Sequence, residues 1–598
     1  MLSILFSWGY MGVITGVTGL ALLQGYHMVT DKISPEKKRH FPSVGYILFL
    51  GIMGCTLYAQ IWGIFSGISL NANLVLLVFI TLYIFFSQKY ILNFLRVWKQ
   101  EPCEFLPQNL FKKRINSKRE RWILFMIIAI VTISYALASS GPVKLIDTDW
   151  YHAQHIRWLE EYGAVKGLGN LFPSLGYNNS QHYFDALFSL KWLFGQSMRT
   201  SGGFFGLALF IHGSLRVSKW NTHKSHIADM IGLWEIAYSI IVTAFYTDPY
   251  VDTLPNALVL VIYTEWVARL EEKKEDIKAI ILDCLLCVFA VVCKLSVVMV
   301  ILLALPPLFL LIRQRRWKEI LIYLAMGLGI ALPFFITNVM ISGYLVYPVA
   351  LVDIFLVPWK MDKEILHYTV DSMVAFARMP LATVEEALNS GFSWIPLWFK
   401  NESISHKILY LTILITALYD IGNMIRGMIS LGNREKKGEG WQEECQMIWM
   451  RICIYLGLVY WFFSIPQVKY CWAFLILPLA MVPISYVQKE RKNEGRLPRG
   501  VLSLSLGVLL MYSGFYGLRT LGYMKEGLLH YPIMQSDYQK YDLKEIRVKE
   551  HRFYIRKEGG DLTSGYYAFP YLDNPENKDN LVLEKRLKHG IYLRGKEE

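Results

Sequence analysis

Charge is scarce in this sequence, and its scarcity excludes a soluble multidomain protein. Only 18% of the 598 residues are Asp, Glu, Lys or Arg, whereas 54% are hydrophobic, and the mean hydropathy is +0.32. A soluble globular chain carries about 25% charged residues and a smaller apolar share. The sequence also has no tandem repeat, low-complexity tract or phosphate-binding P-loop motif. The composition therefore predicts an all-α polytopic integral membrane protein.

Cysteine is also rare, with eight residues in the whole chain. All of them fall in predicted helices or in loops predicted to be cytoplasmic, so no external disulfide framework is expected. Cys284 and Cys287 form a C-x-x-C pattern inside an apolar run. Packing is the favoured interpretation of this pair, ahead of redox chemistry.

Apolar runs of about 20 residues recur along the chain, and this is the length that a helix needs to cross a bilayer. They predict about 14 transmembrane helices, near residues 3–24, 44–67, 72–94, 122–139, 200–217, 228–247, 254–270, 279–293, 296–313, 319–338, 406–426, 448–465, 470–487 and 500–519.

The net charge of +13 comes from Lys and Arg that gather in short loops between the apolar runs. This is the positive-inside pattern of membrane proteins, so no nucleic-acid partner is expected. It predicts a multi-pass protein of the plasma (inner) membrane with both termini extracytoplasmic. The loops expected to be cytoplasmic are 31–40, 111–121, 216–224, 271–278, 313–318, 433–440 and 488–499.

Three regions are expected. Residues 1–119 hold three transmembrane helices and a basic cytoplasmic loop, and residues 120–519 form the transmembrane core, with long external loops at 140–199 and 339–405. The second of these loops is expected to fold over the membrane surface. In residues 520–598 the short runs HRFYIRK, GYYAFPY, NLVLEKR and GIYLRG are β-type, so a small, partly β extracytoplasmic module is expected.

The stretch LIDTDWYHAQHIRWLEEY, residues 145–162, gathers ionisable side chains at the edge of the predicted bilayer. Its periodicity up to Gly163 predicts a short amphipathic helix. Asp147 has two interpretations, which can coexist. It caps this helix by accepting hydrogen bonds from free N–H groups, or it is a general base that takes a proton from an acceptor hydroxyl.

His152 and His155 share a helical face, which His152 also shares with Asp149. These groups can bind a divalent metal, but helical two-His sites more often use a four-residue spacing, so hydrogen bonding or phosphate contact is favoured. Further along, GYNNSQHY either forms a turn or supplies the aromatic and amide groups that line sugar sites, through Tyr177, Asn178, Asn179 and His182.

Two lysines lie at predicted tight external turns: Lys294 in FAVVCKLSVVMV and Lys469 in SIPQVKYCWAF. Each can extend to the lipid headgroups. Alternatively, both converge on the phosphate of a lipid substrate at the leaflet where Asp147 lies. Asp252, in a third external turn, is expected to cap the helix that follows it.

Several of these motifs together resemble a known family. They are D-T-x-x-Y-H-A-Q-x-I-R-W-x-E-E-Y-G-x-V-x-G-L-x-N-L (147–171), GYNNS, SGYLVYPVALVDIF followed by WK (342–360), and NLVLEKRLKHGIYLRG in the tail. The sequence resembles a family of bacterial polytopic membrane proteins without an assigned function. That family is similar in topology, and in an acid of the first loop, to the C-type (GT-C) glycosyltransferases. Residues 1–119 lie outside the resemblance to these enzymes.

The resemblance implies a GT-C-like core and a membrane glycosyltransferase. Such an enzyme takes a sugar from a polyprenyl-phosphate-linked donor and attaches it to a glycan, lipid or protein of the cell envelope. Asp147 matches the family's loop acid and is implied to be the catalytic base, while Tyr151, His152 and Arg157 match the same block. Lys469 stands where the family has an Arg, which removes the two-pronged phosphate contact.

Two other functions remain open at the sequence level. A polymerase or ligase of lipid-linked glycans would depend on Arg157 and His152 instead of an acid. A transporter or flippase would depend on acids inside the bundle, such as Glu235 or Asp283. For these inner acids, with Asp229, structural pairing with nearby Lys or Arg is the favoured interpretation.

Overall fold

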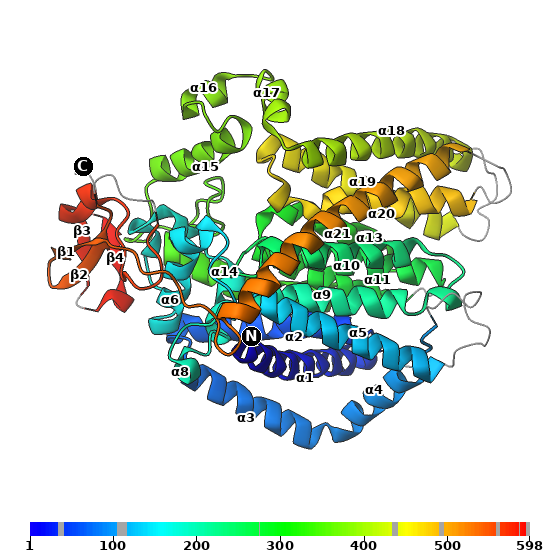
Figure 1. Ribbon diagram of the computed structural model, residues 1–598, viewed down its shortest axis with the longest axis horizontal. Coiled ribbons are helices and arrows are strands. Elements are labelled where there is room, and N and C mark those ends of the chain that lie inside the picture. Colours follow the sequence, from blue (N-terminus) through cyan, green and yellow to red (C-terminus); the bar gives the residue numbers. More distant parts are fainter. Residues whose placement is uncertain are drawn as a thin grey trace.

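The computed structural model describes residues 1–33, 41–104, 117–273, 276–432, 441–489, 496–557, 563–584 and 586–593. It shows a long helical bundle with a small β-containing part at one end (Figure 1). Parts of the expected basic loops lie outside the described residues, namely 34–40, 111–116, 274–275, 433–440 and 490–495.

The helices up to residue 313 are α1 (Leu2–Ile33), α2 (Val44–Phe65), α3 (Leu70–Phe86), α4 (Gln88–Gln100), α5 (Ser117–Ala138), α6 (Ala153–Glu161), α7 (Ser180–Leu187), α8 (Lys191–Phe194), α9 (Ser201–Val217), α10 (Ile227–Phe245), α11 (Thr253–Glu271), α12 (Ile277–Cys293) and α13 (Leu305–Arg313). They are followed by α14 (Trp317–Ser342), α15 (Lys363–Arg378), α16 (Val384–Asn389), α17 (Trp394–Asn401), α18 (Ile404–Gly432), α19 (Trp441–Ser464), α20 (Trp472–Lys489) and α21 (Arg496–His530).

Shorter helical turns connect these helices. One is π-helical, η2 (Thr148–His152). The 3-10 turns are η3 (Leu168–Asn170), η4 (Pro173–Tyr177), η5 (Trp220–Thr222), η6 (Leu295–Ala304), η7 (Val468–Tyr470), η8 (Pro575–Asp579) and η9 (Leu587–His589).

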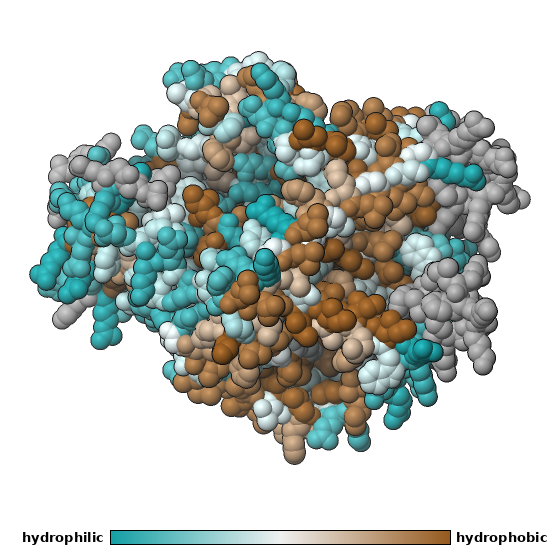
Figure 2. Space-filling view, in the orientation of Figure 1, coloured by the Kyte–Doolittle hydropathy of each residue, from teal (hydrophilic) through white to brown (hydrophobic). Residues whose placement is uncertain are grey.

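All fourteen ranges expected to be helical are helical, which confirms that part of the prediction. Two of them are built from two pieces: 72–94 from α3 and α4, bent by 78°, and 296–313 from η6 and α13. Within the described residues, nine helices are long and apolar enough to cross a membrane, or ten if the bent pair is one span. The chain is therefore a polytopic helical membrane protein. Figure 2 shows hydrophobic side chains spread over the bundle and hydrophilic ones over the end with the strands.

Helices α9 to α12 are buried along most of their length. Because other helices surround them, their polar side chains must find partners inside the protein. The inner acids do so: Asp229 pairs with Arg216 at 2.8 Å, and Asp283 pairs with Arg269. Glu235 accepts a hydrogen bond from Thr264 at 2.6 Å.

The two ends of the bundle differ. At one end, the loop end, Lys278 at the start of α12 lies 3.1 Å from Asp31, close to the last residue of α1. Helix α1 runs the length of the bundle, so its first residue is at the opposite end (Figure 1). There the N-terminal ammonium of Met1 donates to the carbonyl of Tyr531, 2.7 Å away. The N-terminus and the tail thus share one end, which we name the tail end.

The tail contains two short antiparallel hairpins. Strand β1 (Lys544–Val548) pairs with β2 (His551–Ile555), and β3 (Leu581–Leu583) pairs with β4 (Ile591–Leu593). Three of the four expected β-type runs contain a strand, whereas GYYAFPY makes only an isolated bridge, from Tyr571 to Tyr554. Helix α21 extends to His530, past the boundary expected at residue 519.

The tail packs directly on the first long loop. Trp158 and Phe172 share a hydrophobic cluster with Phe553, Tyr571 and Ile591. The expected helix is present as η2 and α6, but seven of the nine α6 residues are buried. The prediction of a short amphipathic helix is confirmed, but its polar side is buried. Its outer face is covered by the tail.

Candidate functional site

Asp147 and Lys469 meet at the tail end. Asp147 directly precedes η2, and Lys469 lies in η7, the turn between α19 and α20. The Nζ atom of Lys469 lies 2.9 Å from Oδ2 of Asp147 and donates a hydrogen bond to it. The two side chains are 26% and 23% exposed, so this ion pair is partly open to solvent.

The second lysine lies beside this pair. Lys294, at the turn between α12 and η6, pairs with Asp252 at the start of α11. Tyr470 lies next to both lysines, with its ring centre 4.5 Å from Nζ of Lys294 and 5.2 Å from Nζ of Lys469. The ring face of Tyr470 attracts cations and helps to hold both ammonium groups in place. We name these five residues the tail-end cluster.

Neither acid of the cluster is a helix cap. Asp147 precedes η2 and Asp252 precedes α11, but neither side chain bonds to a helix N–H. For Asp252 this corrects the sequence prediction. A lysine ammonium is a stronger partner for a carboxylate than a neutral N–H group, so tertiary pairing replaces local capping.

Burial and neighbouring charges shift the pKa values of three groups in the cluster. Burial acts to raise the pKa of Asp147, but the ammonium groups of Lys469 and Lys294 outweigh it and hold that pKa below its usual value. Burial acts to lower the pKa of Lys469, whereas Tyr470 and Asp147 reverse this and raise it above the ordinary lysine value. For Lys294, burial prevails over Asp252 and the pKa is lowered.

Three histidines lie behind the cluster. The Nδ1 atom of His152 is 2.9 Å from the carbonyl of Pro249, and the Nδ1 atoms of His155 and His182 are 2.9 Å apart. Burial lowers the pKa of His152 to about 4 and that of His155 to about 3, and it lowers the pKa of His182 well below the usual range. All three imidazoles are therefore neutral. Among the described residues their Nε2 atoms have no hydrogen-bond partner.

The sequence left open whether His152, His155 and Asp149 bind a divalent metal. Nδ1 of His152 donates to a backbone carbonyl, which leaves its Nε2 as the lone-pair nitrogen. Asp149 turns away to the tail, where its Oδ2 accepts from Tyr541 at 2.8 Å. In the part of the chain that the structure describes, no three His, Cys, Asp or Glu side chains are arranged to hold a metal ion.

Arg157 does not join the cluster. Its Nη1 donates to the carbonyls of Tyr566 and Tyr567 at 2.8 and 2.9 Å, and its guanidinium lies 4.5 Å from the ring centre of Phe569. Its Nε donates to Glu161 within α6, at 2.9 Å. Arg157 thus fastens α6 to the tail.

Three other candidate substrate-binding residues, Asn178, Asn179 and Tyr151, lie in different surroundings. Asn178 is buried, donates to Thr337 at 2.8 Å and accepts from Tyr183 at 2.8 Å, so it ties the first long loop to α14. Asn179 precedes α7 and makes no side-chain cap bond. Tyr151 lies against His152, with ring centres 4.2 Å apart, and so borders the cluster.

Two aromatic residues, one in the cluster and one beside it, were missed by sequence reasoning as site residues. Tyr470 contacts both lysines, and the ring centre of Tyr250 lies 5.8 Å from Nζ of Lys469. Both stand within two positions of a charged residue in a predicted turn, in VKYCW and DPYVD. An aromatic ring next to a charge at the tip of a helical hairpin is the signal that would have identified them.

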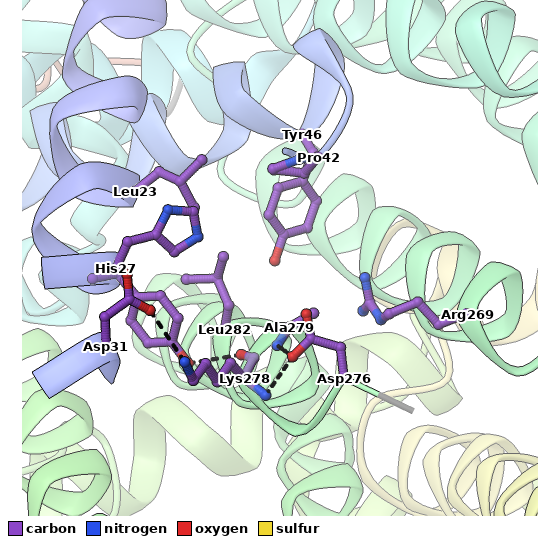
Figure 3. Close-up of a pocket in the computed structure, with 11 residues that line it drawn as sticks. Leu23, His27, Asp31, Pro42, Tyr46, Arg269, Asp276, Lys278, Ala279 and Leu282 are labelled. Atoms are coloured by element: carbon purple, nitrogen blue, oxygen red, sulfur yellow. Dashed lines mark hydrogen bonds and ion pairs between the residues drawn. The ribbon is translucent and has the colours of Figure 1, made fainter. Parts of the chain in front are cut away.

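A separate polar cavity lies at the loop end (Figure 3). Tyr46 and Arg269 point toward it from α2 and α11, and both also contact Asp283. Lys278 is paired with Asp31 beside it. These charges offset one another, and none belongs to the predicted site. Its lining is Leu23, Tyr26, His27, Asp31, Pro42, Tyr46, Arg269, Asp276, Lys278, Ala279 and Leu282.

Comparison with known proteins gives one match. The family model described as "Domain of unknown function (DUF8201)" matches residues 1–476, which include the whole tail-end cluster but not the β-hairpins of the tail. No curated protein and no solved structure matches the chain. Because the model covers most of the 598 residues, the chain belongs to the DUF8201 family.

Proposed function

We propose that this protein is a membrane glycosyltransferase with a GT-C-like core of about 14 transmembrane helices. It takes a sugar from a polyprenyl-phosphate-linked donor and transfers it to a glycan, lipid or protein of the cell envelope. The observation that carries the proposal is the meeting of one ionised acid, Asp147, with two lysines, Lys469 and Lys294, at the tail end.

The distribution of charge supports a reaction on the outer side of the membrane. Lys278, in the described part of one basic loop, and the tail-end cluster lie at opposite ends of the bundle, and basic loops remain in the cytoplasm. The proposed reaction therefore takes place at the outer leaflet of the plasma membrane, with both termini extracytoplasmic. A lipid-linked donor would reach the cluster from that leaflet.

The lysines suit the phosphate of such a donor. A phosphate between Lys469 and Lys294 competes with Asp147 and Asp252 for the two ammonium groups. When Lys469 turns to the phosphate, Asp147 loses the partner that holds its pKa low. Donor binding thereby makes Asp147 a stronger base at the time when a base is needed.

The proposed transfer uses this arrangement in one step. Asp147 takes the proton of the acceptor hydroxyl, and the acceptor oxygen forms a bond to C1 of the sugar. The bond between C1 and the phosphate oxygen breaks, and the polyprenyl phosphate leaves with the electron pair. Lys294 and Lys469 stabilise the charge that grows on this phosphate. His152, held by Pro249, and Tyr151 would orient the donor or the acceptor beside Asp147.

The test compares envelope glycans by mass spectrometry in a deletion strain that expresses the wild type, Asp147→Asn or Asp149→Asn at equal levels. Asp149 is the matched control because its carboxylate accepts from Tyr541 of the tail and lies outside the cluster. The proposal expects a sugar to be lost with Asp147→Asn and kept with Asp149→Asn. Unchanged glycans with Asp147→Asn would contradict the proposed function.

Further substitutions expressed in the same deletion strain separate the other functions. Loss of glycan extension with His152→Ala and Arg157→Ala, while Asp147→Asn is silent, would indicate a polymerase or ligase. Movement of a lipid-linked sugar across sealed vesicles without covalent change, sensitive to Glu235→Gln, would indicate a flippase. Either result would contradict the proposal that the protein is a glycosyltransferase.

A further inference from the structure

An arch of three short helices lies beside the bundle at the tail end. It comprises residues 343–403, including α15, α16 and α17, and Figure 1 shows it next to the end of α18. One side of the arch is attached to the protein. The Tyr177 hydroxyl donates to the sulfur of Met373 in α15 at 2.6 Å, and Nε1 of Trp398 in α17 donates to the carbonyl of Pro466 at 2.9 Å.

The free parts of the arch expose leucine side chains to an unusual degree. Leu351 is 92% exposed, Leu356 98% and Leu381 97%, and all three lie outside the helices. Removing such side chains from water is favourable. Further apolar side chains of the same segment are more than half exposed, namely Ile354, Phe376 and Phe392.

The arch joins a surface that faces lipid. It ends at residue 403, and the apolar helix α18 begins at Ile404 with exposed side chains that include Ile408 and Leu411. At this junction an aromatic group gathers where α17, α18 and α19 meet. Trp394, Trp398 and Trp461 of this group are buried, so the group packs α17 against α18 and α19 and fixes that end of the arch to the apolar helix. Its members are Trp394, Trp398, Tyr410, Trp461 and Phe462.

We propose that the arch is a membrane-inserted element, and that Leu351, Leu356 and Leu381 extend below the headgroups into the acyl chains of the adjacent leaflet. The occupant of this surface is the lipid layer, because the arch that carries the exposed leucines runs directly into α18, which has exposed apolar side chains and the length and composition of a membrane span. Polar residues of the arch stay in water; Glu385 on α16 is exposed. This inference does not depend on the reaction at the tail-end cluster.

The test measures depth in the membrane with the full-length protein in phosphatidylcholine vesicles. Leu356→Cys, Leu381→Cys and the matched control Glu385→Cys are each labelled with an environment-sensitive fluorophore, and the unsubstituted protein gives the background from its own cysteines. Quenching is then compared for lipids that carry a spin label on the acyl chain and for aqueous iodide.

The proposal expects lipid quenching to be severalfold stronger at positions 356 and 381 than at 385, with iodide giving the reverse order. Iodide quenching at 356 and 381 equal to that at 385 would mean that the leucines lie in water. Protection from both quenchers would mean that a protein, such as a second copy of this chain, covers them. Either outcome overturns the proposal.

Discussion

The carboxylate of Asp147 accepts a hydrogen bond from the ammonium group of Lys469, which lies 322 positions later in the chain. The contact joins the beginning of the first long loop to the turn between α19 and α20. It therefore fixes two parts of the bundle relative to each other.

The first prediction concerns the energy of this pair. Because both side chains are about three-quarters buried, we expect a coupling free energy of about 1 kcal/mol, above that of a fully exposed pair. A double-mutant cycle of Asp147→Asn and Lys469→Met, read from thermal unfolding in detergent, measures it. Lys469→Arg is the control that keeps the positive charge. Strictly additive effects of the two substitutions would show that the pair contributes nothing.

The histidines behind the cluster predict a loss of stability in acid. Their pKa values in the folded protein lie near 4 for His152 and 3 for His155, whereas an unfolded histidine titrates near 6.5. The unfolded chain therefore takes up these protons first as the pH falls. The stabilisation is complete above pH 6.5 and decreases below it, by up to about 1.4 kcal/mol per pH unit for each histidine.

The unfolding midpoint measured between pH 7 and pH 4.5 checks this prediction. His155→Gln should reduce the slope, because one of the titrating groups is gone. A midpoint that is flat over this range, or that rises toward acid, would show that the imidazoles are already protonated in the folded protein.

The parts that sequence reasoning predicted well are those determined by local composition. Apolar runs of the length of a bilayer became helices because such a run buries its backbone only by forming one. Lys294 and Lys469 were recognisable as charges in turns between such runs. Asp252 was not recognisable as the partner of Lys294, because it precedes a helix and a residue in that position commonly caps the helix.

The position of the tail could not be predicted from the sequence. The amide of Gln154 donates to the carbonyl of Gly565, 411 positions away, at 2.9 Å. No periodicity within residues 150–162 shows that distant residues will cover the polar side of their helix. Arg157 was a candidate site residue through the family resemblance. Its local sequence does not show that its guanidinium binds carbonyls of the tail.

A prediction about the tail follows from Gly167. Its φ of +71° is in the left-handed region, and a Cβ atom there would fall on the carbonyl oxygen of Ile591 in β4. Gly167→Ala should therefore loosen the tail and expose it to limited proteolysis. Gly195, with a φ of +75° and open space around its Cβ position, is the matched control for backbone strain alone. If Gly195→Ala releases the tail equally, contact with β4 is not the cause.

The last prediction concerns the packing of α1 on α2. A Cβ atom on Gly51 would fall on the carbonyl oxygen of Thr15, so the two helix backbones meet there without a side chain between them. Small residues that let helices approach closely stabilise membrane bundles. Gly51→Ala should lower the stability by about 1–3 kcal/mol, the usual cost of overpacking, and thermal unfolding in detergent measures this. Gly16 on α1 has open space around its Cβ position, so Gly16→Ala should be neutral or slightly stabilising. Equal losses in the two variants would mean that the close contact between α1 and α2 is not what Gly51 provides.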